Sequence, residues 1–272
     1  MTAPSEAAGL HHLRAGGVSA VVFCPPDVGL PRILYWGTDL GRVSQTDLQQ
    51  LATLSVPPVT SYVIDDPVPA AVLPEHGLGY CGQPGVSGHR DGRDWSPLFS
   101  ITEAHGSDTQ VQVQARDVTA ALGLSLTVEL TETGLLRSRA EVTNIHEHES
   151  YSLEGVHLAL PVPPVATEIL DLAGRHPRER VPQRQPFHVG TRARESRRGK
   201  GGHDASLLLI AGTQGFGFRT GEVWGCTLRG AGTNGCTPSG WPPVRTPSSV
   251  AANCYCPVRS VCRPAAATPH RG

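Results

Sequence analysis

The sequence predicts an all-β protein with the architecture of a large antiparallel sandwich, and three observations support this fold class. Glycine supplies 31 and proline 24 of the 272 residues, and both residue types interrupt helices. Several segments alternate apolar and polar residues, which is the pattern of a half-buried strand. Turn residues separate these segments at short intervals, as they do in antiparallel sandwiches.

The first part of the chain predicts two strands and one helix. Residues 1–17 have no strong pattern, so we expect a flexible leader. Val18–Cys24 and Arg32–Trp36 are β-branched and aromatic runs that end at proline or glycine turns, which predicts strands. Gln45–Leu54 follows Val43-Ser44 and has leucines at helical spacing, so it predicts a helix.

A long irregular segment, residues 56–99, is rich in proline, glycine and aspartate, and loops of this length are usually functional or disordered. Regular strands follow it, and Gln214–Arg219 with Glu222–Trp224 predicts a final hairpin. The other predicted strands are Thr109–Arg116, Leu122–Leu130, Leu135–Thr143, Tyr151–Val162 and Ser206–Ile210.

The composition changes abruptly near the end of the chain. All 24 acidic residues lie at or before Glu222, so residues 223–272 contain none. The same stretch holds five of the seven cysteines, and only Cys24 and Cys81 lie before it. Two cysteines in the body fit a reducing, cytoplasmic location without a disulfide framework. The net charge of −1 and the lack of a long apolar run predict neither a nucleic-acid nor a membrane partner.

Five motifs in order carry a family resemblance. Residues 73–99 read LPEHGLGYCGQPGVSGHRDGRDWSPLF, and residues 33–41 read ILYWGTDLG. Three further motifs are LAGRHPRER at 172–180, ESRRGKGGHD at 195–204 and FGFRTGEVWG at 216–225. Together they resemble the N-terminal domain of α-galactosidases of glycoside hydrolase family 36, of the actinobacterial type. A set of ordered motifs is far more specific than one short pattern.

The resemblance implies a galactose-mutarotase-like β-supersandwich over residues 18–225. In the family a (β/α)8 barrel with two catalytic aspartates follows, and the reaction is retaining hydrolysis of terminal α-galactosides. A barrel needs about 250 residues, and fewer than 50 follow residue 225. We therefore expect the barrel to be absent, no catalytic residue in this chain, and no activity of the chain alone.

Residues 226–272 are expected to be a disordered, out-of-frame tail. The family continues with VHVAW after the last motif, and reading the codons of Cys226–Gly230 one base earlier can encode these residues. In that frame Cys254, Tyr255 and Cys256 can become only Leu-Leu-Leu, which matches the ELLLPGE of the family. A frameshift near Gly225 also explains the missing acidic residues and the sudden cysteines.

Asp91, Arg93, Asp94 and Trp95 are the candidate substrate-binding residues. In tetrameric relatives the matching loop reaches the active-site mouth of a neighbouring subunit. A carboxylate accepts hydrogen bonds from sugar hydroxyls, and an aromatic ring stacks on a pyranose face. The expected partners are thus α-galactoside oligosaccharides and, for the intact enzyme, further copies of the chain. The alternative is that these residues only brace the loop through Arg–Asp pairs.

Other clusters predict no metal site, no cofactor and no nucleic-acid site. His146 and His148 share a face but lie in an exposed turn, and the five late cysteines lack paired CxxC spacing. The basic run Arg192–Lys200 has no interleaved aromatics for base stacking. A stand-alone carbohydrate-binding or oligomerisation module is the alternative function, although four Trp and five Tyr supply few rings for stacking.

Overall fold

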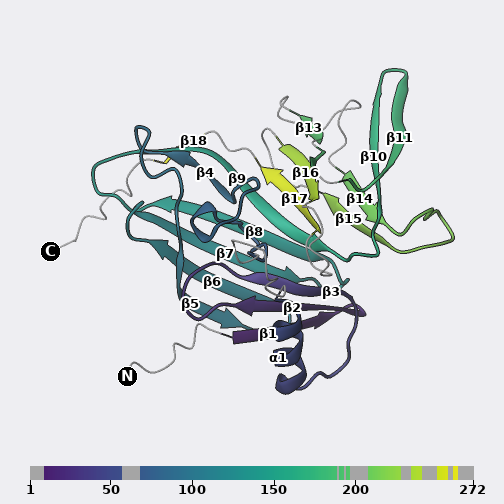
Figure 1. The fold of residues 1–272 in the computed structure, drawn as a ribbon, viewed down its shortest axis with the longest axis horizontal. Coiled ribbons are helices and arrows are strands. Elements are labelled where there is room, and N and C mark those ends of the chain that lie inside the picture. The colour runs from purple at the N-terminus through teal and green to yellow at the C-terminus, as the bar shows by residue number, and fades with distance from the viewer. Residues whose placement is uncertain are drawn as a thin grey trace, which may run out of the picture.

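The computed structural model describes residues 9–56, 68–188, 190–192, 194–196, 208–227, 234–240, 250–256 and 260–262. Within these ranges most residues belong to strands of four antiparallel sheets (Figure 1). The fold class predicted from the sequence is therefore confirmed: the chain is an all-β antiparallel structure.

The elements are β1 (Gly9–Ala15), β2 (Val18–Cys24), β3 (Arg32–Thr38), α1 (Gln45–Leu54), the 3-10 turn η1 (His76–Leu78), β4 (Val86–His89), β5 (Ser100–Gly106), β6 (Gln110–Asp117), β7 (Leu122–Leu130), β8 (Leu136–Asn144), β9 (Tyr151–Val162), β10 (Glu168–Arg175), β11 (Arg178–Pro186), β12 (Gly190–Thr191), β13 (Arg194–Ser196), β14 (Leu208–Gly212), β15 (Val223–Thr227), β16 (Asn234–Gly240), β17 (Val250–Cys256) and β18 (Ser260–Cys262).

The sheet β1-β2-β3 begins earlier than the sequence analysis expected. The prediction of a flexible leader over residues 1–17 is wrong for Gly9–Ala15, because each of its seven residues pairs with β2. Gly16 and Gly17 form the connecting turn with φ of 56° and 77°. A two-residue turn with positive φ at both positions matches the twist of paired strands. The Gly-Gly pair before Val18 was the signal for this hairpin.

The sheet β5-β6-β7-β8 supplies one wall of the main core. Along β7 the buried and half-buried positions alternate over all nine residues, as expected for a strand with one face on a core. The buried side chains of β6 and β7 pack with those of β2, the segment before η1, and β9. The largest fully buried side chains include Leu13, Leu30, Leu73, Phe99, Leu122, Leu124, Leu126 and Tyr151.

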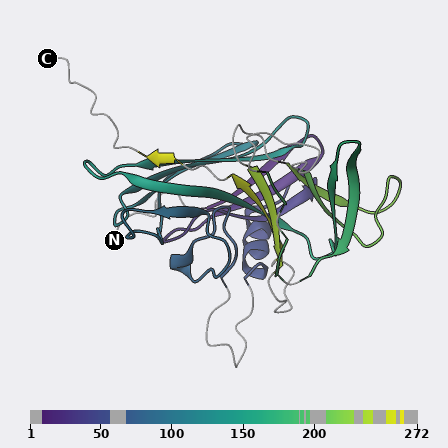
Figure 2. The same cartoon turned by 90° about the horizontal axis from the view of Figure 1, so that it is seen from above.

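Strand β9 crosses the molecule as one long strand and connects the sheets (Figure 2). Strand β4 pairs with its first half, and Trp36 of β3 donates an indole hydrogen bond to the carbonyl oxygen of Pro161 at 2.5 Å. The predicted strand Tyr151–Val162 coincides with β9. Strand β9 therefore contacts both the main core and the segment around η1.

The stretch after Gly225 differs from the prediction of a disordered tail. β15 continues to Thr227, and β17 and β18 pair with β9. An edge strand presents unpaired N–H and C=O groups that can accept any extended segment, whatever its side chains. This backbone pairing explains why strands form in a stretch whose residue pattern predicts none. The other residues of 226–272, apart from β16, lie outside the described residues.

The sheet β11-β10-β14-β15 has a small second core of its own. β10 and β11 stand out at one end of the molecule, with β4 and β18 toward the other (Figures 1 and 2).

The predicted hairpin is wrong in one strand: β15 pairs with β14, and Gln214–Arg219 lies in the loop between them. That loop holds only an isolated bridge between Gly217 and Thr220. Strands β10 and β11 were not predicted from the sequence, and β11 is exposed along nearly its whole length, so it has no buried face that would give an alternating pattern.

Helix α1 begins and ends at the predicted residues. The Ser44 hydroxyl accepts a hydrogen bond from the backbone N–H of Asp47, whose carboxylate accepts one from the Ser44 N–H, which is a capping box. Leu48 buries its side chain against the core. No helix in the described part of the chain is long and apolar enough to span a membrane.

Asp39, in the motif ILYWGTDLG, follows β3 and joins its end to the first hairpin by hydrogen bonds. Its carboxylate accepts two hydrogen bonds from Arg14, at 2.8 and 2.6 Å, and one from the hydroxyl of Ser19 at 2.8 Å. It also accepts the backbone N–H of Gly41 at 3.1 Å. These donors, with Arg14 first, hold the pKa of Asp39 well below its usual range. The motif therefore has a structural role here.

The two turn glycines of the first hairpin give a matched test of this packing. A Cβ on Gly16 would lie 2.4 Å from the backbone nitrogen of Gly134, whereas a Cβ on Gly17 would meet nothing within 4 Å. Both substitutions strain a left-handed residue by roughly 1 kcal/mol. Gly16→Ala should therefore cost about 2 kcal/mol more than Gly17→Ala in urea unfolding. Equal losses would contradict the contact between these two turns.

Candidate functional site

The predicted site residues lie in the segment that connects β4 to β5. Asp91 and Gly92 form a two-residue turn with φ of 48° and 80°, closed by hydrogen bonds of 2.8 and 2.9 Å between the backbones of Arg90 and Arg93. Asp-Gly favours such a turn because both residues tolerate positive φ. The turn leaves the Asp91 side chain exposed at the tip of the loop.

Arg90 fixes the base of this turn to the rest of the fold. Its side chain is only 2% exposed and donates to the carbonyl oxygens of Ala120 and Glu149 at 2.9 and 2.7 Å. It also donates to the amide oxygen of Asn144 at 3.1 Å, and its guanidinium lies over the ring of Tyr151 at 5.6 Å. A buried cation needs partners for its N–H groups, and here they come from the β6–β7 connection, the last residue of β8 and the turn before β9.

Asp94 completes this arrangement from the other side of the turn. Its carboxylate accepts a hydrogen bond from Nε of Arg90 at 3.3 Å, and its backbone carbonyl accepts one from the hydroxyl of Tyr151 at 3.1 Å. Burial raises the pKa of Tyr151 to about 12, so this hydroxyl keeps its proton as a donor. Asp94 therefore has its backbone and side chain held in place, with φ of 57°.

Arg93 does not join the buried guanidinium of Arg90 but forms an ion pair on the surface. Its guanidinium donates to the carboxylate of Glu149 at 3.2 Å, and 64% of the side chain is exposed. The same carboxylate lies 3.9 Å from Nε2 of His146. Of the loop-bracing Arg–Asp pairs that the sequence analysis left as an alternative, the structure forms Arg90–Asp94, whereas Arg93 pairs with a glutamate.

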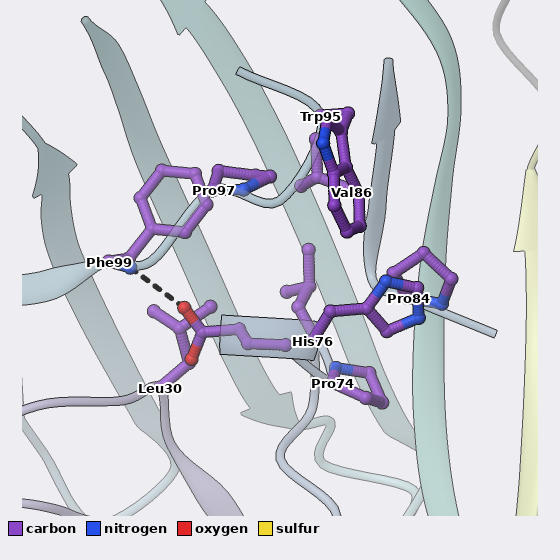
Figure 3. Close-up of a pocket in the computed structure, with 10 residues that line it drawn as sticks. Leu30, Pro74, His76, Pro84, Val86, Trp95, Pro97 and Phe99 are labelled. Atoms are coloured by element: carbon purple, nitrogen blue, oxygen red, sulfur yellow. Dashed lines mark hydrogen bonds between the residues drawn. The ribbon is translucent and has the colours of Figure 1, made fainter. Parts of the chain in front are cut away.

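Trp95 is the aromatic residue that the loop presents to solvent, with 62% of its surface exposed. Its ring meets the ring of His76 edge to face at 6.2 Å between centroids. Figure 3 shows the indole at the mouth of a small cavity, beside Val86 and opposite Pro74 and Pro84. The loop therefore brings together an exposed carboxylate, Asp91, and an exposed ring, Trp95, on one short segment.

Two carboxylates that the sequence analysis missed hold the backbone after Trp95. Asp117 accepts the N–H of Leu98 at 2.7 Å, and Glu75 accepts the N–H of Phe99 at 2.8 Å. Glu75 stands in the recognised motif LPEHG, but its role depends on a contact 24 residues away. Arg90 was missed for the same reason, because its partners are up to 59 residues distant in the sequence.

The described residues contain no cluster of three or more potential metal ligands. His146 uses Nδ1 to accept the backbone N–H groups of His148 and Glu149, so it serves the turn. Burial raises the pKa of the Cys24 thiol to about 12, which makes it a poor nucleophile. Among the late cysteines Cys226 is disulfide-bonded, and the side chains of the others lie outside the described residues.

The basic run is described only in part. Arg192 donates to the buried carboxylate of Asp171 from Nε and Nη2, at 3.2 and 3.1 Å, and to the amide oxygen of Gln185 at 2.8 Å. It therefore packs against the β10–β11 hairpin. The side chains of the other residues up to Lys200 lie outside the described residues.

Comparison with known proteins agrees with this fold and these motifs. Residues 29–229 match the Glycosyl hydrolase family 36 N-terminal domain. The chain belongs to glycosyl hydrolase family 36. An α-galactosidase of Escherichia coli is 31% identical over 202 residues, which are 74% of this chain.

Solved α-galactosidase structures have the same fold. The α-galactosidase AgaA from Geobacillus stearothermophilus aligns with 90% of this chain at a TM-score of 0.70 and 18% identity. The α-galactosidase from Lactobacillus brevis aligns with 93% at a TM-score of 0.71 and 17% identity. This chain spans 28% of the length of the E. coli enzyme and 36% of each of the two solved chains.

Arg90 and Arg93 provide a matched pair for testing what fixes the family 36 loop. Arg90→Lys keeps the charge but loses the forked geometry in a buried site, so it should cost roughly 2–4 kcal/mol of unfolding free energy. Arg93→Lys, in an exposed ion pair, should change stability by less than about 0.5 kcal/mol. Urea unfolding of both variants measures the difference. Equal effects would show that the buried contacts of Arg90 do not stabilise the fold.

Proposed function

We propose that this chain supplies the N-terminal domain of an α-galactosidase that hydrolyses terminal α-galactosides in carbohydrate catabolism. The match to the E. coli α-galactosidase over 202 residues carries the proposal. The substrate class follows from the same family: structures of AgaA variants hold raffinose and stachyose. A reducing location such as the cytoplasm is proposed from the free thiols at Cys24 and Cys81, whereas the disulfide-bonded Cys226, in the stretch after Gly225, does not support it.

The 272-residue chain alone is proposed to be inactive. Retaining glycosidases need a nucleophile and an acid/base carboxyl about 5–5.5 Å apart, on opposite sides of a bound sugar. Asp94 in the loop, and Glu75 and Asp117 that hold the loop from outside it, each accept hydrogen bonds within the fold. The chemistry is assigned to a barrel domain, which the sheets described here do not form.

Within an intact oligomer, the four loop residues are proposed to divide their roles. Asp91 and Trp95 are exposed and suit direct contact with a saccharide, the first through hydroxyl hydrogen bonds and the second through stacking. Arg93 and Asp94 are engaged with Glu149 and Arg90 and keep the loop in shape. Any contact that they make with substrate would add to this role.

We also infer that the reading frame changes near Gly225. The loss of acidic residues after Glu222 supports this, as does the forced Leu-Leu-Leu that the other frame gives at Cys254–Cys256. These residues lie on β17, beside β9 in the fold.

The first test compares two proteins on a nitrophenyl α-galactoside. The 272-residue chain should show no turnover, and the product of the gene read in the other frame beyond codon 225 should hydrolyse the substrate. Turnover by the 272-residue chain would overturn the proposed inactivity. A second frame without a long coding stretch would overturn the frameshift.

The second test addresses the loop in the frame-restored enzyme. Trp95→Ala should raise KM for raffinose about tenfold, which corresponds to the loss of roughly 1–1.5 kcal/mol of stacking. Trp95→Phe keeps a ring and should retain most of the affinity. An unchanged KM in both variants would place Trp95 outside the substrate-binding surface.

The stand-alone carbohydrate-binding or oligomerisation module remains the alternative. Calorimetric titration of the 272-residue chain with raffinose, and its sizing by light scattering, separate the two functions. Saturable binding without a barrel, or a defined oligomer, would favour the module.

A further inference from the structure

Trp95 is largely exposed, yet its ring has a defined contact within the fold. The ring of His76 meets it edge to face, with 6.2 Å between the ring centroids and 64° between the ring planes. This arrangement is favourable because the positive edge of one ring lies against the negative face of the other. The contact joins the 3-10 turn η1 to the loop after β4, so a separate segment of the chain acts on the orientation of Trp95.

His76 is itself fixed at both ends. Its Nε2–H donates a hydrogen bond to the backbone carbonyl oxygen of Gly82 at 2.9 Å, which sets the plane of the ring. Its own carbonyl oxygen accepts the N–H of Gly79 at 2.9 Å, and Gly79 closes the turn with φ of 89°. Figure 3 shows the His76 ring beside that of Pro84. A ring held in this way presents one orientation to Trp95.

The segment that carries His76 is anchored to the core. The N–H of Gly85 donates to the carbonyl oxygen of Pro74 at 2.6 Å, which closes the segment 74–85 on itself. The carbonyl oxygen of Gly85 accepts the N–H of His157 on β9 at 2.7 Å, and Leu73, directly before the segment, is fully buried. His76 therefore belongs to a rigid scaffold and not to the loop that it contacts.

The backbone on both sides of Trp95 is held by other residues. Tyr151 donates to the carbonyl oxygen of Asp94, and Asp117 accepts the N–H of Leu98. The freedom that remains at Trp95 is the rotation of its side chain. An exposed indole that rotates freely loses this freedom when it stacks on a sugar, which weakens binding. A neighbouring ring that fixes the rotation beforehand removes this loss.

We propose that His76 is the positioning residue that orients Trp95 for stacking on a saccharide. It acts through the indole ring and makes no contact with the sugar. This inference rests on the saccharide contact proposed above for Trp95 in the intact enzyme. Because the stacked ring contacts the bound substrate and the transition state alike, loss of His76 should raise KM and leave kcat unchanged.

Three variants of the frame-restored enzyme separate the ring of His76 from its hydrogen bond. His76→Phe keeps a ring but loses the bond to Gly82, whereas His76→Gln keeps a donor for Gly82 but loses the ring. His76→Ala and His76→Gln should raise KM for raffinose about fivefold, with kcat within about twofold, and His76→Phe should change KM by less than about twofold. A KM that is normal in His76→Gln and raised in His76→Phe would show that His76 only braces the turn, and would overturn the proposal.

A double-mutant cycle isolates the pair. In the Trp95→Ala background, His76→Ala should leave KM unchanged, because the ring that it orients is absent. Additive effects would contradict the positioning role. A raised KM in Trp95→Ala with an unchanged KM in His76→Ala would overturn the positioning alone, whereas an unchanged KM in Trp95→Ala would overturn the saccharide contact as well.

Fluorine NMR of the 272-residue chain labelled with fluorotryptophan tests the orientation without any activity. The Trp95 resonance is assigned by its loss in Trp95→Phe. His76→Ala and His76→Gln should narrow this resonance and shift it toward that of the free amino acid, while His76→Phe should keep it broad. The Trp36 resonance is the internal control, because its indole N–H bonds to Pro161 far from His76 and reports that the fold is kept. A Trp95 resonance that is unchanged in His76→Ala and His76→Gln would overturn the proposal.

Discussion

The buried guanidinium of Arg90 is the contact on which the candidate site depends. It donates hydrogen bonds to the β6–β7 connection, the end of β8 and the turn before β9, and it lies over the face of the Tyr151 ring. Without these acceptors the Asp91-Gly92 turn would have no fixed orientation relative to the sandwich. A single desolvated cation therefore gives a glycine-rich segment a defined loop conformation. Loss of any one hydrogen-bond partner would leave part of this buried charge unpaired, which is unfavourable.

Carboxylates that accept backbone N–H groups are a second recurring device in this fold. Asp39 closes β3 onto the first hairpin, Asp117 holds Leu98, and Glu75 holds Phe99. Each fixes a stretch of chain that lies outside the strands. For Leu98 and Phe99 the N–H group is at least partly buried and would otherwise lack an acceptor. Glu75 differs from Asp39 in its surroundings: arginine and hydroxyl donors stabilise the Asp39 charge, whereas apolar walls destabilise that of Glu75.

The long strand β9 joins the recognised domain to the stretch that follows it. Its inner residues pack in the main core, and its outer edge pairs with β17 and β18. Backbone pairing at an open edge depends little on side chains. This explains how residues with no strand pattern can occupy the edge, and why composition was a poor guide to structure after Gly225.

The sequence alone determined the all-β class, the family, the helix Gln45–Leu54 and the strands β2, β7 and β9, because local periodicity, capping and ordered motifs are encoded within short windows. It also located the loop with Asp91, Arg93, Asp94 and Trp95. Only the tertiary structure decided which of these side chains face solvent and which brace the loop. Arg90, Glu75 and Asp117 each have a partner that lies 19 to 59 residues away. Burial, which sets their charge and their hydrogen bonds, exists only once the sheets have packed.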